Sequence, residues 1–191
     1  VDKTMYIKAL EDQARTLIFI RPRRFGKSLF INMMRLYYDK LEAENFEKLF
    51  GDLYIGQYPT PLRNKYQVLY LDFSRVGGNV DTLQEDFNDY CNAQLSSFMD
   101  AYRDDYPPFQ VAEFFESKSA RTRFSILRNM AERAQIPLYL FIDEYDNFTN
   151  VVLNERGEEI YHQMTLASGF YRDIFKLFKG MFERIFLTGV S

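Results

Sequence analysis

The chain has 191 residues and a formal net charge of −3, and its sequence pI is about 5.3. This length suits one domain with a sizeable core, and the acidic balance excludes a basic footprint over the whole surface of the kind that binds DNA or RNA. A single cysteine, Cys91, excludes an intrachain disulfide and fits a reducing compartment such as the cytoplasm. The single histidine, His162, argues against a histidine-rich metal site, and no run approaches the ~20 apolar residues of a membrane span.

Short apolar runs without a clean alternation predict four strands that are covered on both faces, as in a parallel sheet. These runs lie at residues 17–20, 68–73, 138–142 and 185–188. Helical stripes of apolar residues fall between them, over residues 26–37, 42–50, 80–102, 119–134 and 167–182. The alternation predicts an α/β domain with a mostly parallel sheet. Residues 80–135, between strands two and three, are expected to form a helical insertion or a cap over one face.

The segment Gly26, Lys27 and Ser28 follows the first predicted strand and begins the first predicted helix. This is the setting of a Walker A loop, in which the N–H groups at the helix start and the helix dipole attract phosphate. In such a loop Lys27 reaches the β- and γ-phosphates, Ser28 supplies a hydroxyl ligand to Mg²⁺, and Gly26 allows close backbone approach. The expected nucleotide-binding residues are Arg23, Arg24, Phe25, Gly26, Lys27 and Ser28.

The loop departs from the pattern G-x-x-x-x-G-K-[ST], because Arg21 stands where the first glycine belongs. Pro22 also removes one backbone donor, so the loop is expected to bend in its own way. The arginines at positions 21, 23 and 24 either add charged contacts to phosphate or pair with acidic neighbours on a solvated loop. The sequence leaves both alternatives open.

The third predicted strand ends in Asp143 and Glu144, which is the pattern of a Walker B motif. Because the carboxyl ends of parallel strands share one edge of a sheet, Asp143 and Lys27 are expected to converge there. Asp143 is the expected Mg²⁺ ligand together with Ser28, and Glu144 is expected to polarise an attacking water. The alternative is a strand that ends in a polar turn. The two motifs together predict a P-loop NTPase fold, a three-layer sandwich with a mostly parallel sheet.

Other polar residues near the predicted strand ends have weaker signals. Thr188 is the candidate for contact with the γ-phosphate or the water, with Ser191 in reserve, although a strand-end hydroxyl also often bonds a turn. Asp72 ends the second strand, where helix capping or a turn is favoured over catalysis. Cys91 lies on an apolar helical stripe and is expected in the core, and His162 is expected on the surface or in packing.

Four segments together resemble the bacterial AAA-ATPase-like family: VDKT at 1–4, RPRRFGKS at 21–28, FIDEYD at 141–146 and TGVS at 188–191. The resemblance also covers this departure, because arginine commonly stands in place of the first glycine in that family. The resemblance implies one P-loop domain over residues 1–191, with an additional strand between the two Walker strands and a fifth strand beyond Ser191. It also implies that the chain is the N-terminal part of a larger protein, with the lid, a second sensor and an arginine finger further on. Members of the family often carry a region similar to PD-(D/E)XK nucleases in that later part.

The favoured function is Mg²⁺-dependent hydrolysis of ATP by a domain that drives or gates an attached or partner module. One alternative is a nucleotide-gated switch or interaction module with little hydrolysis, and another is the ATPase part of a nucleic-acid-processing protein. The expected cofactors are ATP and Mg²⁺. The expected partners are the nucleotide and a nuclease-like region or protein client, with nucleic acid bound only through that region. Neither membrane contact nor an oligomeric state is indicated.

Overall fold

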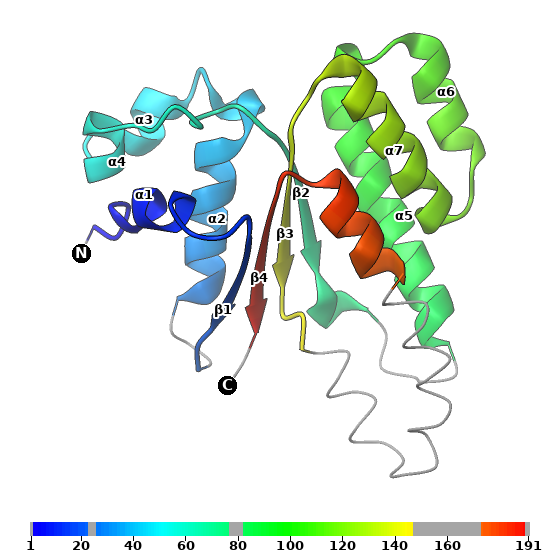
Figure 1. The fold of residues 1–191 in the computed structure, drawn as a ribbon, viewed down its shortest axis with the longest axis horizontal. Helices are drawn as coiled ribbons and strands as arrows, with labels where there is room; N and C mark the ends of the chain where they lie inside the picture. Colours follow the sequence, from blue (N-terminus) through cyan, green and yellow to red (C-terminus); the bar gives the residue numbers. More distant parts are fainter. Residues whose placement is uncertain (1, 23–25, 77–81, 147–172, 190–191) are drawn as a thin grey trace.

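The computed structural model describes residues 2–22, 26–76, 82–146 and 173–189. Its centre is a sheet of four parallel strands in the order β1-β4-β3-β2 (Figure 1). The strands are β1 (Thr16–Ile20), β2 (Gln67–Asp72), β3 (Leu138–Asp143) and β4 (Arg184–Gly189). The four predicted strands and their parallel pairing are confirmed. Strand β4 lies between β1 and β3, as the family resemblance implied.

One face of the sheet is covered by the N-terminal helices (Figure 1). These are α1 (Tyr6–Glu11), α2 (Lys27–Tyr38), α3 (Phe46–Phe50) and α4 (Tyr54–Gln57), with the 3-10 turn η1 (Lys40–Glu42) between α2 and α3. The core on this face is built largely from aromatic rings, among them Tyr37, Tyr38, Phe46, Phe50, Tyr66, Tyr139, Phe141 and Phe186. Burial of large rings supplies much of the hydrophobic stabilisation of this layer.

The opposite face is covered by the helices that follow β2 and by the helical residues 173–181 (Figure 1). The elements between β2 and β3 are η2 (Phe73–Arg75), α5 (Leu83–Tyr102), η3 (Arg103–Asp105), α6 (Pro108–Glu116) and α7 (Ala120–Ala134). The molecule therefore has three layers. Cys91 is fully buried on α5, as expected. Residues 80–135 are largely helical where the structure describes them, as predicted. That this region is an insertion stays an interpretation.

Three short helices were not predicted from the sequence, namely α1, α4 and α6. Helix α6 begins at Pro108, and at this first helical position the missing N–H of proline costs nothing. The helix predicted over 42–50 was too long, because the α-helix begins only at Phe46. The segment before it forms the separate 3-10 turn η1, which the side chain of Asp39 caps. Of the helix predicted over 167–182, residues 173–181 are helical, and residues 167–172 lie outside the described part, as does His162.

Two tyrosines of α5 close the outer edge of β2. The hydroxyl of Tyr102 accepts a hydrogen bond from the N–H of Val68 at 2.9 Å, and that of Tyr90 accepts one from the N–H of Asp72 at 2.6 Å. An outer strand otherwise presents unpaired N–H groups that can pair with another chain. The tyrosines therefore satisfy two N–H groups of this edge and fix α5 to the strand that ends beside Asp143.

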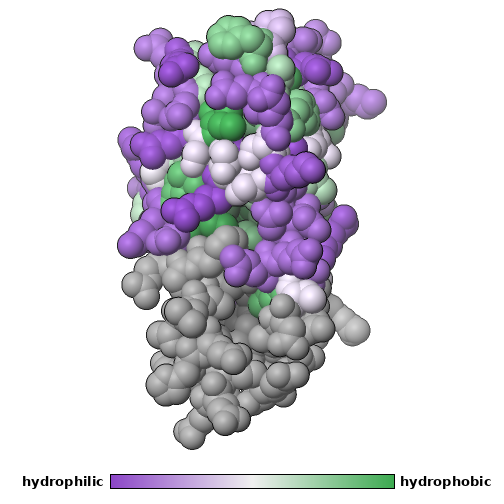
Figure 2. Space-filling model, turned by 90° about the vertical axis from the view of Figure 1, so that its right-hand side faces the viewer, coloured by the Kyte–Doolittle hydropathy of each residue, from purple (hydrophilic) through white to green (hydrophobic). Residues whose placement is uncertain are grey.

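The side of the molecule that carries α5, α6 and α7 is mostly hydrophilic where it is described, with apolar residues in separate areas (Figure 2). Among the described helices, none is both long and apolar enough to cross a membrane.

Candidate functional site

The start of α2 requires a glycine. Gly26 precedes the helix with a φ of 75°, in the left-handed region that residues with a side chain rarely adopt. A Cβ atom at this position would meet nothing within 4 Å, so the backbone conformation alone selects glycine here. The preceding residues Arg23, Arg24 and Phe25, which were predicted to bind nucleotide, lie outside the described residues.

Lys27 is buried, with 7 % of its surface exposed, and its ammonium group lies between two backbone carbonyls. The Nζ atom donates to the carbonyl of Gly189 at 2.9 Å and to that of Arg21 at 3.2 Å. An ammonium group has three hydrogens, so beyond these two acceptors among the described residues it can donate one more hydrogen bond. The lysine is thus held at the carboxyl ends of β1 and β4.

Arg21 itself adopts an arrangement that neither sequence alternative foresaw. Its guanidinium carbon lies 5.3 Å from the centroid of the Phe19 ring, a cation–π contact at the end of β1.

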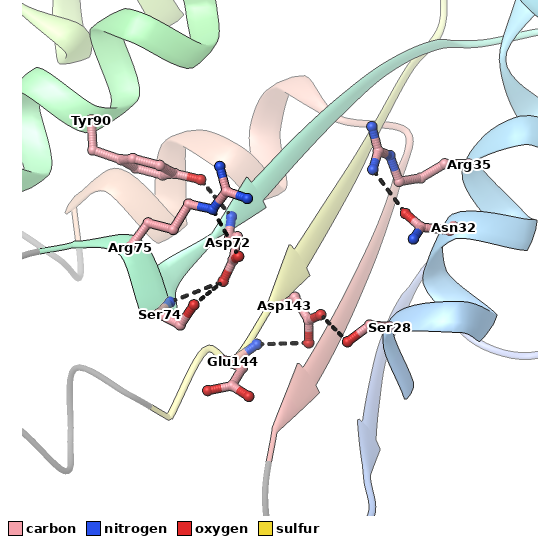
Figure 3. Close-up of polar contacts among 9 residues, drawn as sticks. All are labelled: Ser28, Asn32, Arg35, Asp72, Ser74, Arg75, Tyr90, Asp143 and Glu144. Carbon is pink, nitrogen blue, oxygen red and sulfur yellow. Dashed lines mark hydrogen bonds and ion pairs between the residues drawn. The ribbon is translucent and has the colours of Figure 1, made fainter. Parts of the chain in front are cut away.

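The two predicted magnesium ligands, Ser28 and Asp143, lie together. The hydroxyl of Ser28 donates to Oδ2 of Asp143 at 3.0 Å, across 115 residues of sequence (Figure 3). A hydroxyl and a carboxylate are oxygen ligands that suit Mg²⁺, which binds few protein groups and keeps several waters. Within the described ranges no group of three or more His, Cys, Asp or Glu residues could hold a metal by itself. The pair therefore fits Mg²⁺ bound together with phosphate better than a metal held by protein alone.

Asp143 is held in place by its neighbours as well as by Ser28. It is 4 % exposed, and its Oδ1 accepts hydrogen bonds from the hydroxyl of Thr188 and from the N–H of Glu144. Such partners fix the direction in which a carboxylate presents its remaining lone pairs.

Thr188 is fully buried on β4, and its hydroxyl donates to Asp143. The sequence predicted that this hydroxyl touches the γ-phosphate or the water, and that contact stays a prediction. The observed hydrogen bond orients the carboxylate of Asp143. The reserve candidate, Ser191, lies outside the described residues.

Glu144 has a φ of 52°, a left-handed conformation that is uncommon for a residue with a side chain. Two hydrogen bonds hold the backbone here, from the N–H of Glu144 to Asp143 at 3.0 Å and from the N–H of Tyr145 to the carbonyl of Thr188 at 3.0 Å. Backbone strain of about 1–3 kcal/mol persists where the surroundings enforce it, and such residues cluster at functional sites. The turn directs the Glu144 side chain away from the strand and leaves it partly exposed (Figure 3).

Asp72 has the turn role that its sequence position favoured. Its Oδ1 accepts from the N–H and the hydroxyl of Ser74, at 3.1 Å and 2.6 Å, and its Oδ2 lies 3.2 Å from Nε of Arg75 (Figure 3). Asp72 is also paired in register with Asp143 on the neighbouring strand. Burial first, and then the charges of Asp143 and Asp72, raise the pKa of the nearby Tyr70 hydroxyl.

Sequence reasoning missed the polar side of α2 beyond Ser28. Arg35 donates to Oδ1 of Asn32 at 3.0 Å, and its guanidinium carbon lies 4.1 Å from the centroid of the Tyr70 ring (Figure 3). Burial lowers the pKa of this guanidinium. The spacing of residues 28, 32 and 35 along one side of a helix was the signal available. The carbonyl of Gly189 was also missed, and a backbone acceptor leaves no signal in a sequence.

The chain is an α/β protein that is consistent with a P-loop-like fold. Three features support this: the parallel sheet, the glycine that starts α2, and the Ser28–Asp143 pair at the edge of the sheet. The family described as "Predicted AAA-ATPase" matches residues 1–191, and the chain belongs to that family. No curated protein and no solved structure matches the chain. Membership of the family supports nucleotide binding and a general ATPase activity.

Proposed function

We propose that this chain binds ATP with Mg²⁺ and hydrolyses it to ADP and phosphate. The observation that carries the proposal is the convergence of Lys27 and Ser28, from the start of α2, with Asp143, from the end of β3, at the carboxyl edge of the sheet. Ligands of parallel α/β sheets bind at this edge. The start of α2 adds backbone N–H groups and the positive end of a helix dipole, which both favour a phosphate group.

Each residue has a role in the proposed reaction. Lys27 donates its remaining hydrogen to a phosphate oxygen, and Ser28 and Asp143 hold Mg²⁺, which neutralises charge on the phosphates. Glu144 accepts a hydrogen bond from the attacking water and orients it in line with the bond that breaks. Thr188 keeps Asp143 in its orientation. Catalysis then rests on positioning and on charge stabilisation, since the protein forms no covalent bond to phosphate.

The alternative is a switch that binds ATP and hydrolyses it little or not at all. Phosphate release by wild type and by Glu144→Gln, measured with Mg²⁺-ATP in excess, separates the two. An ATPase loses at least ~100-fold in rate with the glutamine, because a general base contributes on that scale. Equal rates in the two proteins contradict hydrolysis at this site and favour the switch, provided that ATP still binds.

A further inference from the structure

Gly189, the last residue of β4, lies where three parts of the candidate site meet. Its carbonyl accepts the hydrogen bond from Nζ of Lys27 at 2.9 Å. The same carbonyl accepts from the N–H of Arg21 at 3.4 Å, which joins it to the end of β1. Its neighbour Thr188 holds Asp143 through the side-chain hydroxyl. One short segment thus contacts both the lysine of the phosphate loop and the expected metal ligand.

The residues after the acidic pair occupy the space that a side chain at position 189 would need. A Cβ atom on Gly189 would lie 2.6 Å from Cε1 of Tyr145 and 2.9 Å from Oδ1 of Asp146. Real Cβ contacts are essentially never shorter than 3.0 Å, so one of the partners would have to move. Backbone conformation is not the reason for glycine here, because among the described glycines only Gly26 has a positive φ.

We propose that Gly189 is a positioning residue that couples the lysine of the phosphate loop to the turn after Asp143. Its carbonyl fixes the ammonium of Lys27, and its lack of a side chain lets Tyr145 and Asp146 pack against the end of β4. This inference rests on the proposed function, because the lysine must act on a phosphate for its placement to matter.

Gly189 acts on the lysine only by fixing the position of the ammonium group. Two carbonyls use two of the three ammonium hydrogens, so the third points in a direction that the backbone of residues 21 and 189 sets. A charge-assisted hydrogen bond to phosphate loses strength when its donor is displaced or misaligned. A shift of the Gly189 carbonyl therefore weakens the phosphate contact while the lysine itself remains.

The test is a double-mutant cycle between positions 189 and 27, read as the dissociation constant for Mg²⁺-ATP. Gly189→Ala in the wild-type background is expected to weaken binding about tenfold, from the loss of one well-aligned charged hydrogen bond. In the Lys27→Ala background the same change is expected to have less than about a twofold effect, since the contact that it disturbs is already gone. An equal loss in both backgrounds, or no loss in the wild-type background, overturns the inference.

Gly180→Ala is the matched control, because a Cβ atom there would lie 3.7 Å from the nearest atom of Arg128, an ordinary contact. It is expected to bind Mg²⁺-ATP as the wild type does. The wild-type titration tests the proposed function separately, since a chain that binds no ATP fails before any variant is compared.

If Gly189→Ala does not fold, Gly189→Ala with Tyr145→Ala is the second variant. Removing the ring removes the contacts with Cε1 and Cδ1 of Tyr145, and only Oδ1 of Asp146 is left within 3.0 Å. The double variant is expected to fold and to bind Mg²⁺-ATP more tightly than Lys27→Ala. A double variant that also fails to fold, or that binds no better than Lys27→Ala, contradicts the proposed packing.

Discussion

The hydroxyl of Ser28, in the first turn of α2, donates a hydrogen bond to the carboxylate of Asp143, the last residue of β3. Two residues that are 115 positions apart thus come within 3.0 Å. The parallel sheet explains the meeting, because every strand delivers its carboxyl end to the same edge. The contact joins the two motifs that carry the proposed function.

Replacing Thr188 by valine is expected to raise the Mg²⁺ concentration needed for half-maximal ATP binding by at least ~10-fold, the scale on which partners of metal ligands act. Valine keeps the shape but removes the buried hydroxyl that orients Asp143. The measurement is a Mg²⁺ titration at fixed ATP. Thr188→Ser, which keeps the hydroxyl, serves as the control and should stay close to wild type.

An unchanged Mg²⁺ midpoint in Thr188→Val contradicts this role. If ATP affinity nevertheless falls in that variant, the hydroxyl acts on the phosphate, as the sequence first suggested.

Replacing Tyr90 by phenylalanine is expected to lower the free energy of unfolding by about 1–2 kcal/mol, because the N–H of Asp72 loses its acceptor. Urea unfolding of the two proteins measures the difference. Tyr58→Phe is the control, since the Tyr58 side chain is 62 % exposed, and exposed substitutions stay within about 0.5 kcal/mol. Equal losses in the two variants would show that the hydroxyl of Tyr90 does not protect the edge of β2.

The carboxyl group of Asp39 gives a prediction about pH. Burial raises its pKa above the ordinary 3.8, against hydrogen bonds from the N–H of Leu41 and the hydroxyl of Tyr102 and the charge of Arg35, which lower it. The folded protein therefore binds this proton more tightly than the unfolded chain does, so ionisation of Asp39 costs stability as the pH rises above 3.8.

Asp39→Asn removes that ionisation and can keep both hydrogen bonds, since both use the single atom Oδ1. The free energy of unfolding of the variant minus that of wild type is expected to increase as the pH rises above 3.8, and to level off once the carboxyl group of the folded protein is fully ionised. Urea unfolding at a series of pH values measures it. A difference that stays constant or decreases over this range contradicts the raised pKa.

The main elements of the fold could be predicted from the sequence because long or unbroken apolar patterns specify them. The four strands and the helices α2, α5 and α7 all have such patterns. The short helices α1 and α4 have no such pattern. Hydrogen bonds between distant parts of the chain stabilise this region instead. The carboxylate of Asp2 accepts from the N–H of Tyr54, and the hydroxyl of Thr4 accepts from the N–H of Ile55, both at the start of α4.

In the candidate site, too, some residues could be predicted from the sequence and others could not. Ser28, Lys27 and Asp143 belong to motifs with a fixed spacing, and the structure brings them together. The contact of Thr188 with Asp143 depends on which strand lies beside β3, which a linear pattern does not state. The role of Gly189 depends on a carbonyl and on an absent side chain, so only the folded chain reveals it.

Lys27, Ser28 and Asp143 are proposed to form a binding site for Mg²⁺-ATP. Isothermal titration with ATP, with and without Mg²⁺, tests it most directly in wild type and Lys27→Ala. Wild type is expected to bind ATP more tightly with Mg²⁺, and Lys27→Ala is expected to weaken this binding by about 1.5–3 kcal/mol, the scale of a hydrogen bond to a charged group. Equal affinity in the two proteins, or no dependence on Mg²⁺, would contradict it.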